Sequence, residues 1–211
     1  DRSRLEAAQR EVSTQTINAG QRIQILSCDI REFTTVSQTL EQWVEEYGLP
    51  DLVINSAGVT YPGYFQELDV ETFHWLMDIN YFGTVHILKT LIPGMIGRGS
   101  GKIVNISSQA GFVGVFGYSA YGASKYAVSG LSDVLRAEMK PLGIQVSIVY
   151  PPDTQTPQLA FEAPLKPIET KEIASSASVL SPEQVADAIL KGIEKGKYVI
   201  IPGLEGKIFY R

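Results

Sequence analysis

Residues 51–58, "DLVINSAG", open with an apolar run in which polar and apolar side chains do not alternate. A strand with one face in water would alternate, so this run predicts a strand buried on both faces, as in a parallel sheet. Four other short stretches are typical of strands: 22–29 ("RIQILSCD"), 102–107 ("KIVNIS"), 144–150 ("IQVSIVY") and 197–202 ("KYVIIP").

Helical periodicity separates these strands, over residues 2–14, 31–47, 69–97 in two pieces, 119–141 and 181–196. Asp69 and Ser181 are expected as N-caps, and Gly196 as a helix stop. Residues 153–180, rich in Pro, Ser and Thr, are expected to be irregular. Strict alternation of strand and helix predicts a doubly wound α/β fold of the Rossmann type, with one parallel sheet and one domain over residues 1–211.

The composition excludes several classes of function. The net charge is −5 and the sequence pI is near 5.1, which does not favour a nucleic-acid partner. Cys28 is the one cysteine, so a disulfide framework and a Cys-based metal site are excluded. His74 and His86 lie twelve residues apart without a third partner nearby, so no zinc site is expected.

A dinucleotide-binding fold needs a glycine-rich turn between its first strand and helix. Two stretches imitate one: 94–101 ("GMIGRGSG") lies between a helix and the next strand, and 111–117 ("GFVGVFG") has the wrong spacing. We expect the first to be a helix cap and the second to line a substrate site. The sequence thus lacks the N-terminal strand, glycine-rich turn, helix and second strand, and we expect roughly 30 to 40 residues to precede Asp1 in the natural protein.

The stretch "YGASK", 121–125, places Tyr121 and Lys125 one helical turn apart. A nearby ammonium favours the phenolate and so lowers the tyrosine pKa, which brings the group closer to catalytic use. Tyr118 is two turns from Lys125, too far for this coupling, and is expected at the substrate side of the site or in packing. Such pairs also arise by chance on solvated helix faces, so neighbouring residues must support the assignment.

Two further polar residues supply that support. Ser108 follows the strand at 102–107 and lies thirteen residues before Tyr121, so its hydroxyl could bind the same substrate oxygen. Asn80 lies in an apolar helical run, where a buried amide needs a partner. It is either a satisfied core amide or a group that holds a water or the lysine in place.

Together these residues resemble the short-chain dehydrogenase/reductase family, in its order and approximate spacing. The resemblance rests on "NSAG" (55–58), Asn80, Ser108, Tyr121 and Lys125. It implies an NAD(P)H-dependent reductase in which Tyr121 protonates a carbonyl oxygen, Ser108 positions that oxygen, Lys125 binds the nicotinamide ribose and Asn80 supports a proton-relay water.

The same resemblance implies a dinucleotide site. Its expected residues are Asp29 and Ile30 at the adenine, Asn55, Ala57 and Gly58 at the adenosine ribose, and Pro151, Thr154 and Thr156 with Tyr121 and Lys125 at the nicotinamide end. Pro152 departs from the family's glycine, so we expect altered backbone contacts there. Arg2 and Arg4 favour NADPH, without excluding NADH, since the residue that normally discriminates falls at or before residue 1.

The segments 150–157 ("YPPDTQTP"), 166–170 ("KPIET") and 181–186 ("SPEQVA") are similar to those of the 3-ketodihydrosphingosine reductases, a branch of this family. This similarity implies a long-chain lipid ketone as substrate, with residues 153–180 as a lid over the site. It also implies peripheral membrane association in the cytoplasm, at the endoplasmic reticulum in a eukaryote.

Two alternatives stay open. One is another short-chain reductase, acting on 3-oxoacyl thioesters or hydroxysteroid-type ketones, and the other is a non-catalytic cofactor-binding scaffold. The family's habit of pairing through the helices at 69–97 and 119–141 implies a homodimer or homotetramer.

Overall fold

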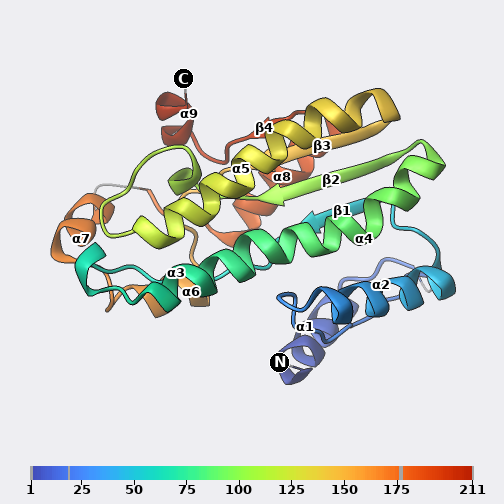
Figure 1. The fold of residues 1–211 in the computed structure, drawn as a ribbon, viewed down its shortest axis with the longest axis horizontal. Coiled ribbons are helices and arrows are strands. Elements are labelled where there is room, and N and C mark those ends of the chain that lie inside the picture. Colours follow the sequence, from blue (N-terminus) through green and yellow to red (C-terminus); the bar gives the residue numbers. More distant parts are fainter. Residues whose placement is uncertain (1, 19, 176–177, 211) are drawn as a thin grey trace.

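The computed structural model of the chain describes residues 2–18, 20–175 and 178–210. Its centre is a parallel sheet in the order β1-β2-β3-β4 (Figure 1). The strands are β1 (Leu52–Asn55), β2 (Gly101–Ile106), β3 (Ile144–Val149) and β4 (Val199–Ile200). Every neighbouring pair is parallel, so each strand ends at the same edge of the sheet. The predicted doubly wound α/β fold is confirmed.

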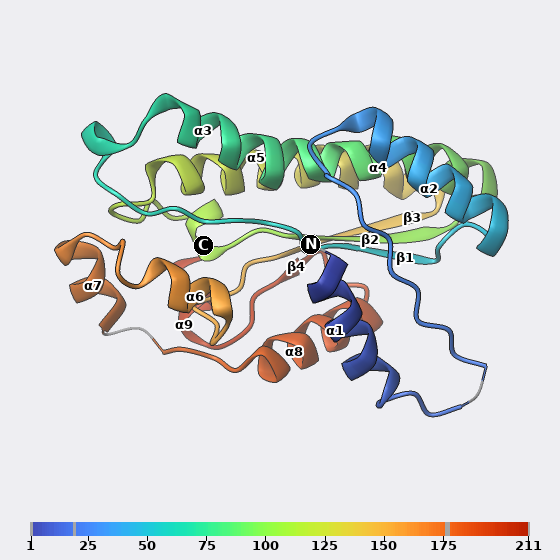
Figure 2. The ribbon, with the colours of Figure 1, turned by 90° about the horizontal axis from the view of Figure 1, so that it is seen from below.

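Helices cover both faces of the sheet, as Figure 2 shows. On one face lie α2 (Phe33–Tyr47), α3 (Val70–Met77), α4 (Gly83–Arg98) and α5 (Ser119–Met139). On the other lie α1 (Arg2–Ser13), α6 (Pro157–Glu162), α7 (Ile168–Ser175), α8 (Pro182–Glu194) and α9 (Glu205–Phe209). The five helices predicted from periodicity therefore all form, with small shifts at their ends.

The largest core cluster lies between the sheet and the α4–α5 layer. Its fully buried members are Met95 on α4, Ile103 on β2 and Ile144 on β3. Met139 of α5 belongs to the same cluster, and Leu131 and Leu135 pack against it. This core holds α5 against β2 and β3, and so fixes the helix that carries Tyr121.

The strand predicted at 22–29 does not form, and that prediction is wrong. Residues 21–29 run without regular secondary structure, because β1 pairs only with β2 among the described residues. A strand needs a neighbour to accept and donate its ladder hydrogen bonds. Along β1 the side chains alternate between exposed and buried, with Leu52 and Ile54 37% and 44% exposed, so the prediction of a strand buried on both faces is also wrong.

Residues 153–180 contain two helices where we expected irregular structure. Thr156 caps α6 by accepting a hydrogen bond from the Leu159 backbone N–H at 3.4 Å, and Pro157 occupies the first turn. With six and eight residues, α6 and α7 are too short to give a clear periodic signal.

The helical run at 69–97 divides at a π-helical turn, Asp78–Phe82. Asp69 occupies the N-cap of α3, but its side chain makes no capping bond. Ser181 does cap α8, in a reciprocal pair with Gln184, as expected. Gly99, in the first glycine-rich stretch, is a left-handed C-cap of α4, which confirms the interpretation of that stretch as a cap.

Candidate active site

A cleft of about 510 Å³ lies beyond the carboxyl ends of β2 and β3. Its walls come from the residues that follow β1, β2 and β3, from the first turns of α5, and from α6, α7 and α8. Ligands of open parallel sheets bind at this edge. The cleft is therefore the candidate active site.

Tyr121 and Lys125 line the cleft from consecutive turns of α5. Both are buried, with 9% and 6% of their surface exposed. The Lys125 ammonium donates to the carbonyl of Ile106 at 3.0 Å, and its nitrogen lies 5.7 Å from the centroid of the Tyr121 ring. The lysine is thus anchored to the end of β2 while it lies beside the tyrosine.

Burial sets the protonation of both groups. It raises the pKa of Tyr121 to about 12, a hydrogen bond to the Ser108 side chain acts in the opposite direction, and the charges of Glu162 and Asp153 raise the value further. Burial lowers the pKa of Lys125 to about 8. The prediction of a lowered tyrosine pKa is therefore wrong for this structure, because desolvation of the phenolate outweighs the groups that favour it.

Ser108 stands between β2 and a 3₁₀ turn, Gln109–Gly111. Its backbone is extended, and its hydroxyl oxygen accepts a hydrogen bond from the Ala110 backbone N–H at 3.2 Å. This bond holds the hydroxyl in the cleft wall, within hydrogen-bonding reach of Tyr121. The two oxygens can therefore act on one substrate atom.

Asn80 lies in the π-helical turn behind this wall, with 1% of its surface exposed. Its amide oxygen accepts from the Val59 backbone N–H at 2.8 Å, and its amide nitrogen donates to the Val59 carbonyl and the Ser124 hydroxyl, each at 2.9 Å. The side chain is fully satisfied, and it ties the loop after β1 to α5. Its predicted role in a proton relay stays a prediction.

Hydroxyl groups that sequence reasoning missed fasten α5 to the end of β2. The Ser107 hydroxyl donates to the Lys125 carbonyl at 3.0 Å. The Ser129 hydroxyl lies 3.0 Å from the carbonyls of both Lys125 and Gly111. The Ser107–Lys125 and Ser129–Gly111 contacts each join residues 18 positions apart, and serines are too common for the sequence to reveal such pairing.

The predicted cofactor residues divide into two groups. The structure brings Gly58, Pro151, Thr154 and Thr156 to the cleft together with Tyr121 and Lys125. Asp29, Ile30, Asn55 and Ala57 do not line it.

The second group has other contacts. Asp29 forms an ion pair with Arg31 at 2.6 Å, and hydrogen bonds from Arg31 lower the Asp29 pKa to about 2. The Ile30 carbonyl lies 2.8 Å from the His86 ring nitrogen Nδ1. The Asn55 amide donates to Asn105 at 2.8 Å, within the sheet, while Ala57 is exposed.

The cleft contains an ionic network that the sequence did not reveal. Tyr118 donates to the Glu162 carboxylate at 2.9 Å, and Lys166 lies 3.0 Å from Glu162 and 3.5 Å from Asp153. Tyr118 thus lines the cleft beside Glu162, in line with the first of its two expected places, the substrate side of the site. Glu162 ends α6 and Lys166 lies between α6 and α7, and their pairing gave no signal because α6 was not predicted.

The wall near Lys125 fits the nicotinamide end of a dinucleotide. Gly58 approaches it so closely that an added Cβ atom would lie 3.3 Å from the Lys125 ammonium nitrogen and 3.1 Å from the Asn80 amide oxygen. This wall therefore presents the Gly58 backbone, the buried Lys125 ammonium and two residues with hydroxyl groups, Thr154 and Thr156. Lys125, Thr154 and Thr156 would hold the ribose and the carboxamide there.

Two absences hold for the described residues. No group of three or more His, Cys, Asp or Glu side chains could hold a metal ion there. In the same part of the chain, every helix is too short or too polar to cross a membrane.

Comparison with known proteins gives one family. A family model described as short chain dehydrogenase matches residues 2–164. The 3-ketodihydrosphingosine reductase of Bos taurus is 40% identical over 204 residues, which are 96% of this chain and 61% of that protein. The 3-ketodihydrosphingosine reductase of Dictyostelium discoideum is 43% identical over 208 residues, 94% of this chain and 62% of that protein. The chain therefore spans 61% and 62% of the length of these two curated relatives.

A solved structure agrees with the fold. A short-chain dehydrogenase from Sphingobium yanoikuyae in complex with NADPH superimposes with a TM-score of 0.83 at 27% identity, over 100% of this chain and 78% of that chain.

Proposed function

Because the chain belongs to the short chain dehydrogenase family, we propose that it is the catalytic part of an NADPH-dependent reductase that converts 3-ketodihydrosphingosine to dihydrosphingosine. One observation carries the proposal: Ser108, Tyr121 and Lys125 line one wall of a cleft in a chain 40% and 43% identical to two 3-ketodihydrosphingosine reductases. The same three residues argue against a non-catalytic scaffold, which has no need of a proton donor.

In the proposed reaction the ketone oxygen lies between the Ser108 hydroxyl and the Tyr121 phenol. When bound, the dinucleotide supplies the hydride equivalent that reduces the carbonyl carbon. Tyr121 gives its proton to the oxygen, which becomes the product hydroxyl. With a pKa of about 12 the phenol stays protonated at neutral pH, as an acid in the reductive direction must.

Lys125 has two parts in this proposal. Its ammonium would bind the nicotinamide ribose and support the phenolate that forms as the proton leaves. Asn80 keeps the helix and the loop after β1 in register, and so positions Lys125 rather than touching substrate.

NADPH is the proposed cofactor, supported by the NADPH complex of the Sphingobium yanoikuyae relative. Arg2 pairs with Glu6 at 3.0 Å on the exposed face of α1, so its contribution to a 2′-phosphate site requires that this pair open. A direct comparison of NADPH with NADH tests the assignment.

The proposed substrate has a long alkyl chain, which requires apolar walls. Val115, Leu159, Ile173 and Val185 line the cleft. We propose that α6 and α7 form a lid over it, because both helices contribute to its walls.

Exposed apolar side chains on the same two helices support a proposed peripheral contact with the cytosolic face of a membrane. Phe161 on α6 is 54% exposed, and Ile168 on α7 is 61% exposed. A vesicle flotation assay tests this contact. We expect a smaller fraction of the Phe161→Ser/Ile168→Ser double variant than of the wild type to float with the vesicles.

Activity is tested by NADPH oxidation with 3-ketodihydrosphingosine, a 3-oxoacyl thioester and a steroid ketone. We expect turnover of the first, and a loss of roughly 10²–10⁴-fold in the Tyr121→Phe variant, which removes the proton donor. Tyr126→Phe is the matched control, because Tyr126 lies on the same helix and is 46% exposed. Turnover of only the thioester or steroid would overturn the substrate, and an unchanged Tyr121→Phe rate would overturn the catalytic assignment.

A further inference from the structure

A buried ionic network forms the substrate side of the cleft. Glu162 is its centre: the carboxylate accepts a hydrogen bond from Tyr118 at 2.9 Å and pairs with Lys166 at 3.0 Å. Lys166 also reaches Asp153 at 3.5 Å. Glu162 and Lys166 have 6% and 8% of their surface exposed. All four residues line the cleft.

The charges in this network do not balance. Two carboxylates, Asp153 and Glu162, share the single ammonium of Lys166, so the three groups carry a net charge of −1. The lysine approaches Glu162 more closely, and the Asp153 side chain is 34% exposed. Carboxylates that line a cleft and outnumber their ammonium partner attract cations, so a cation that enters the cleft would compensate the excess charge.

The network lies next to the proton donor. The rings of Tyr118 and Tyr121 have centroids 5.6 Å apart. The negative charges of Glu162 and Asp153 also act on Tyr121, where both raise the phenol pKa and so make it a weaker acid. A positive charge bound at this place would reverse that effect and favour proton transfer to the substrate.

We propose that Glu162, assisted by Asp153, determines specificity by binding an ammonium group carried on the carbon next to the substrate carbonyl. This inference rests on the proposed function. A 3-ketosphinganine has a primary amine on the carbon between its ketone and its terminal hydroxymethyl group, so the charge lies one carbon from the reacting centre. With the ketone oxygen at Tyr121, the ammonium lies on the Tyr118 side of the cleft.

The charge of the substrate thus contributes to its own recognition. An amino ketone cancels the excess negative charge beside Tyr121, whereas a ketone without the amine leaves it in place. Charge-assisted hydrogen bonds contribute about 1.5–3 kcal/mol, which corresponds to about 10- to 100-fold in kcat/KM.

The test compares two ketones of equal chain length, 3-ketodihydrosphingosine and 1-hydroxyoctadecan-3-one, which lacks only the amine. We expect the wild type to prefer the amino ketone by about 10- to 100-fold in kcat/KM. Glu162→Gln should lose most of this preference: kcat/KM toward the amino ketone should fall, whereas kcat/KM toward the neutral ketone should rise, because the negative charge that weakens Tyr121 as an acid is gone. Asp153→Asn should lose a smaller part, and it serves as the second variant if Glu162→Gln does not fold.

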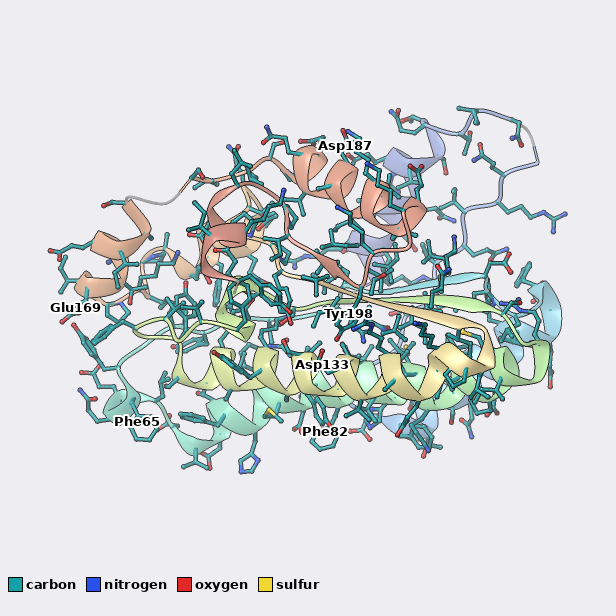
Figure 3. The ribbon with its side chains drawn as sticks, turned by 90° about the horizontal axis from the view of Figure 1, so that it is seen from above. Phe65, Phe82, Asp133, Glu169, Asp187 and Tyr198 are labelled. Atoms are coloured by element: carbon teal, nitrogen blue, oxygen red, sulfur yellow. The ribbon has the colours of Figure 1, made fainter. Side chains whose placement is uncertain are left out.

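Glu169→Gln is the matched control. Glu169 also accepts a hydrogen bond from a tyrosine hydroxyl, that of Tyr64 at 3.0 Å, but it lies outside the cleft, on α7 at the end of the molecule (Figure 3). It should keep the wild-type preference. Equal loss on both ketones in Glu162→Gln and in Asp153→Asn, or equal use of both ketones by the wild type, would overturn the ammonium site while leaving the reductase intact. Failure of the wild type to reduce either ketone would instead overturn the proposed function.

Discussion

Burial of the Lys125 ammonium lowers the stability of the folded protein, although the proposed reaction requires this residue. Its ammonium lies in the protein interior and donates a hydrogen bond to the Ile106 carbonyl, and burial lowers its pKa from 10.5 to about 8. Between these two values the unfolded chain binds more protons than the folded chain. The free energy of unfolding therefore rises with pH from about 8 to 10.5.

We expect Lys125→Met to be more stable than the wild type at pH 7, by up to about 3 kcal/mol less the lost hydrogen bond. The advantage should shrink as pH rises through 8 toward 10.5, where the wild-type lysine loses its proton in both states. Urea unfolding at several pH values measures it. A difference that stays constant over this range would contradict the assigned burial cost, and the variant should lack reductase activity at every pH.

The site residues that the sequence predicts can be recognised from local position. Each either lies at a fixed spacing from another within one helix or comes directly after a strand. Tyr121 and Lys125 are one turn apart on a helix, and Ser108 directly follows β2. Glu162 could not be predicted in this way. Its partner Tyr118 is 44 residues away, and the six-residue helix that presents it depends on the Thr156 cap rather than on a periodic pattern.

At the scale of elements, two glycines mark where helices turn back into the sheet. Gly99 ends α4 with φ +73°, and Gly143 precedes β3 with φ +77°. An added Cβ at Gly99 would meet nothing within 4 Å, whereas at Gly143 it would fall on the Gly99 carbonyl oxygen. The two positions therefore separate backbone strain from steric overlap.

Gly99→Ala should cost about 1–2 kcal/mol, the strain of a left-handed backbone alone. Gly143→Ala should cost about 1–3 kcal/mol more, because the two turns must also move apart. Thermal or urea unfolding of both variants gives the comparison, with Gly97→Ala as a control at a helical position with open space. Equal losses at Gly99 and Gly143 would show that the turns are not in contact.

The same scale shows why the strand at 22–29 was predicted and is absent. Its β-rich composition describes a local preference, but a strand exists only through a neighbour, and β1 offers its ladder to β2 alone among the described residues. The sequence of residues 21–29 contains no information about that partner. The helices were easier to predict, because their hydrogen bonds close within the element itself.

At the scale of the whole molecule, the α4–α5 layer presents apolar side chains to solvent. Val134 on α5 is 55% exposed, and Phe82, just before α4, is 43% exposed and lies on the outer side of the layer (Figure 3). These side chains support the proposal that two copies pair through this layer. The faces of the sheet are covered by helices (Figure 2), so two copies can meet through the helical layer but not through the faces of the sheet.

We expect the protein to be a dimer or tetramer in solution, and Val134→Glu to reduce its mass toward that of a monomer, because a charge would be buried at the interface. Light scattering after size-exclusion chromatography measures the mass. Val179→Glu is the control, since Val179 is 51% exposed and lies outside both helices. An identical mass for Val134→Glu and the wild type would place any interface elsewhere.

The serine bridges around Lys125 have a consequence for how the molecule opens. Ser107 joins α5 to the end of β2 and Ser129 joins it to the turn that follows, so we expect the proton-transfer wall to open only together with the core of the fold. The opposite wall is formed by the short helices α6 and α7 and by the ionic network of Asp153, Glu162 and Lys166. We therefore expect substrate entry to draw on local opening of α6 and α7, and the amide hydrogens of α5 around Lys125 to exchange with solvent only when the whole domain unfolds. Substrate access thus depends on the free energy of local opening, whereas the integrity of the proton-transfer wall depends on the free energy of global unfolding.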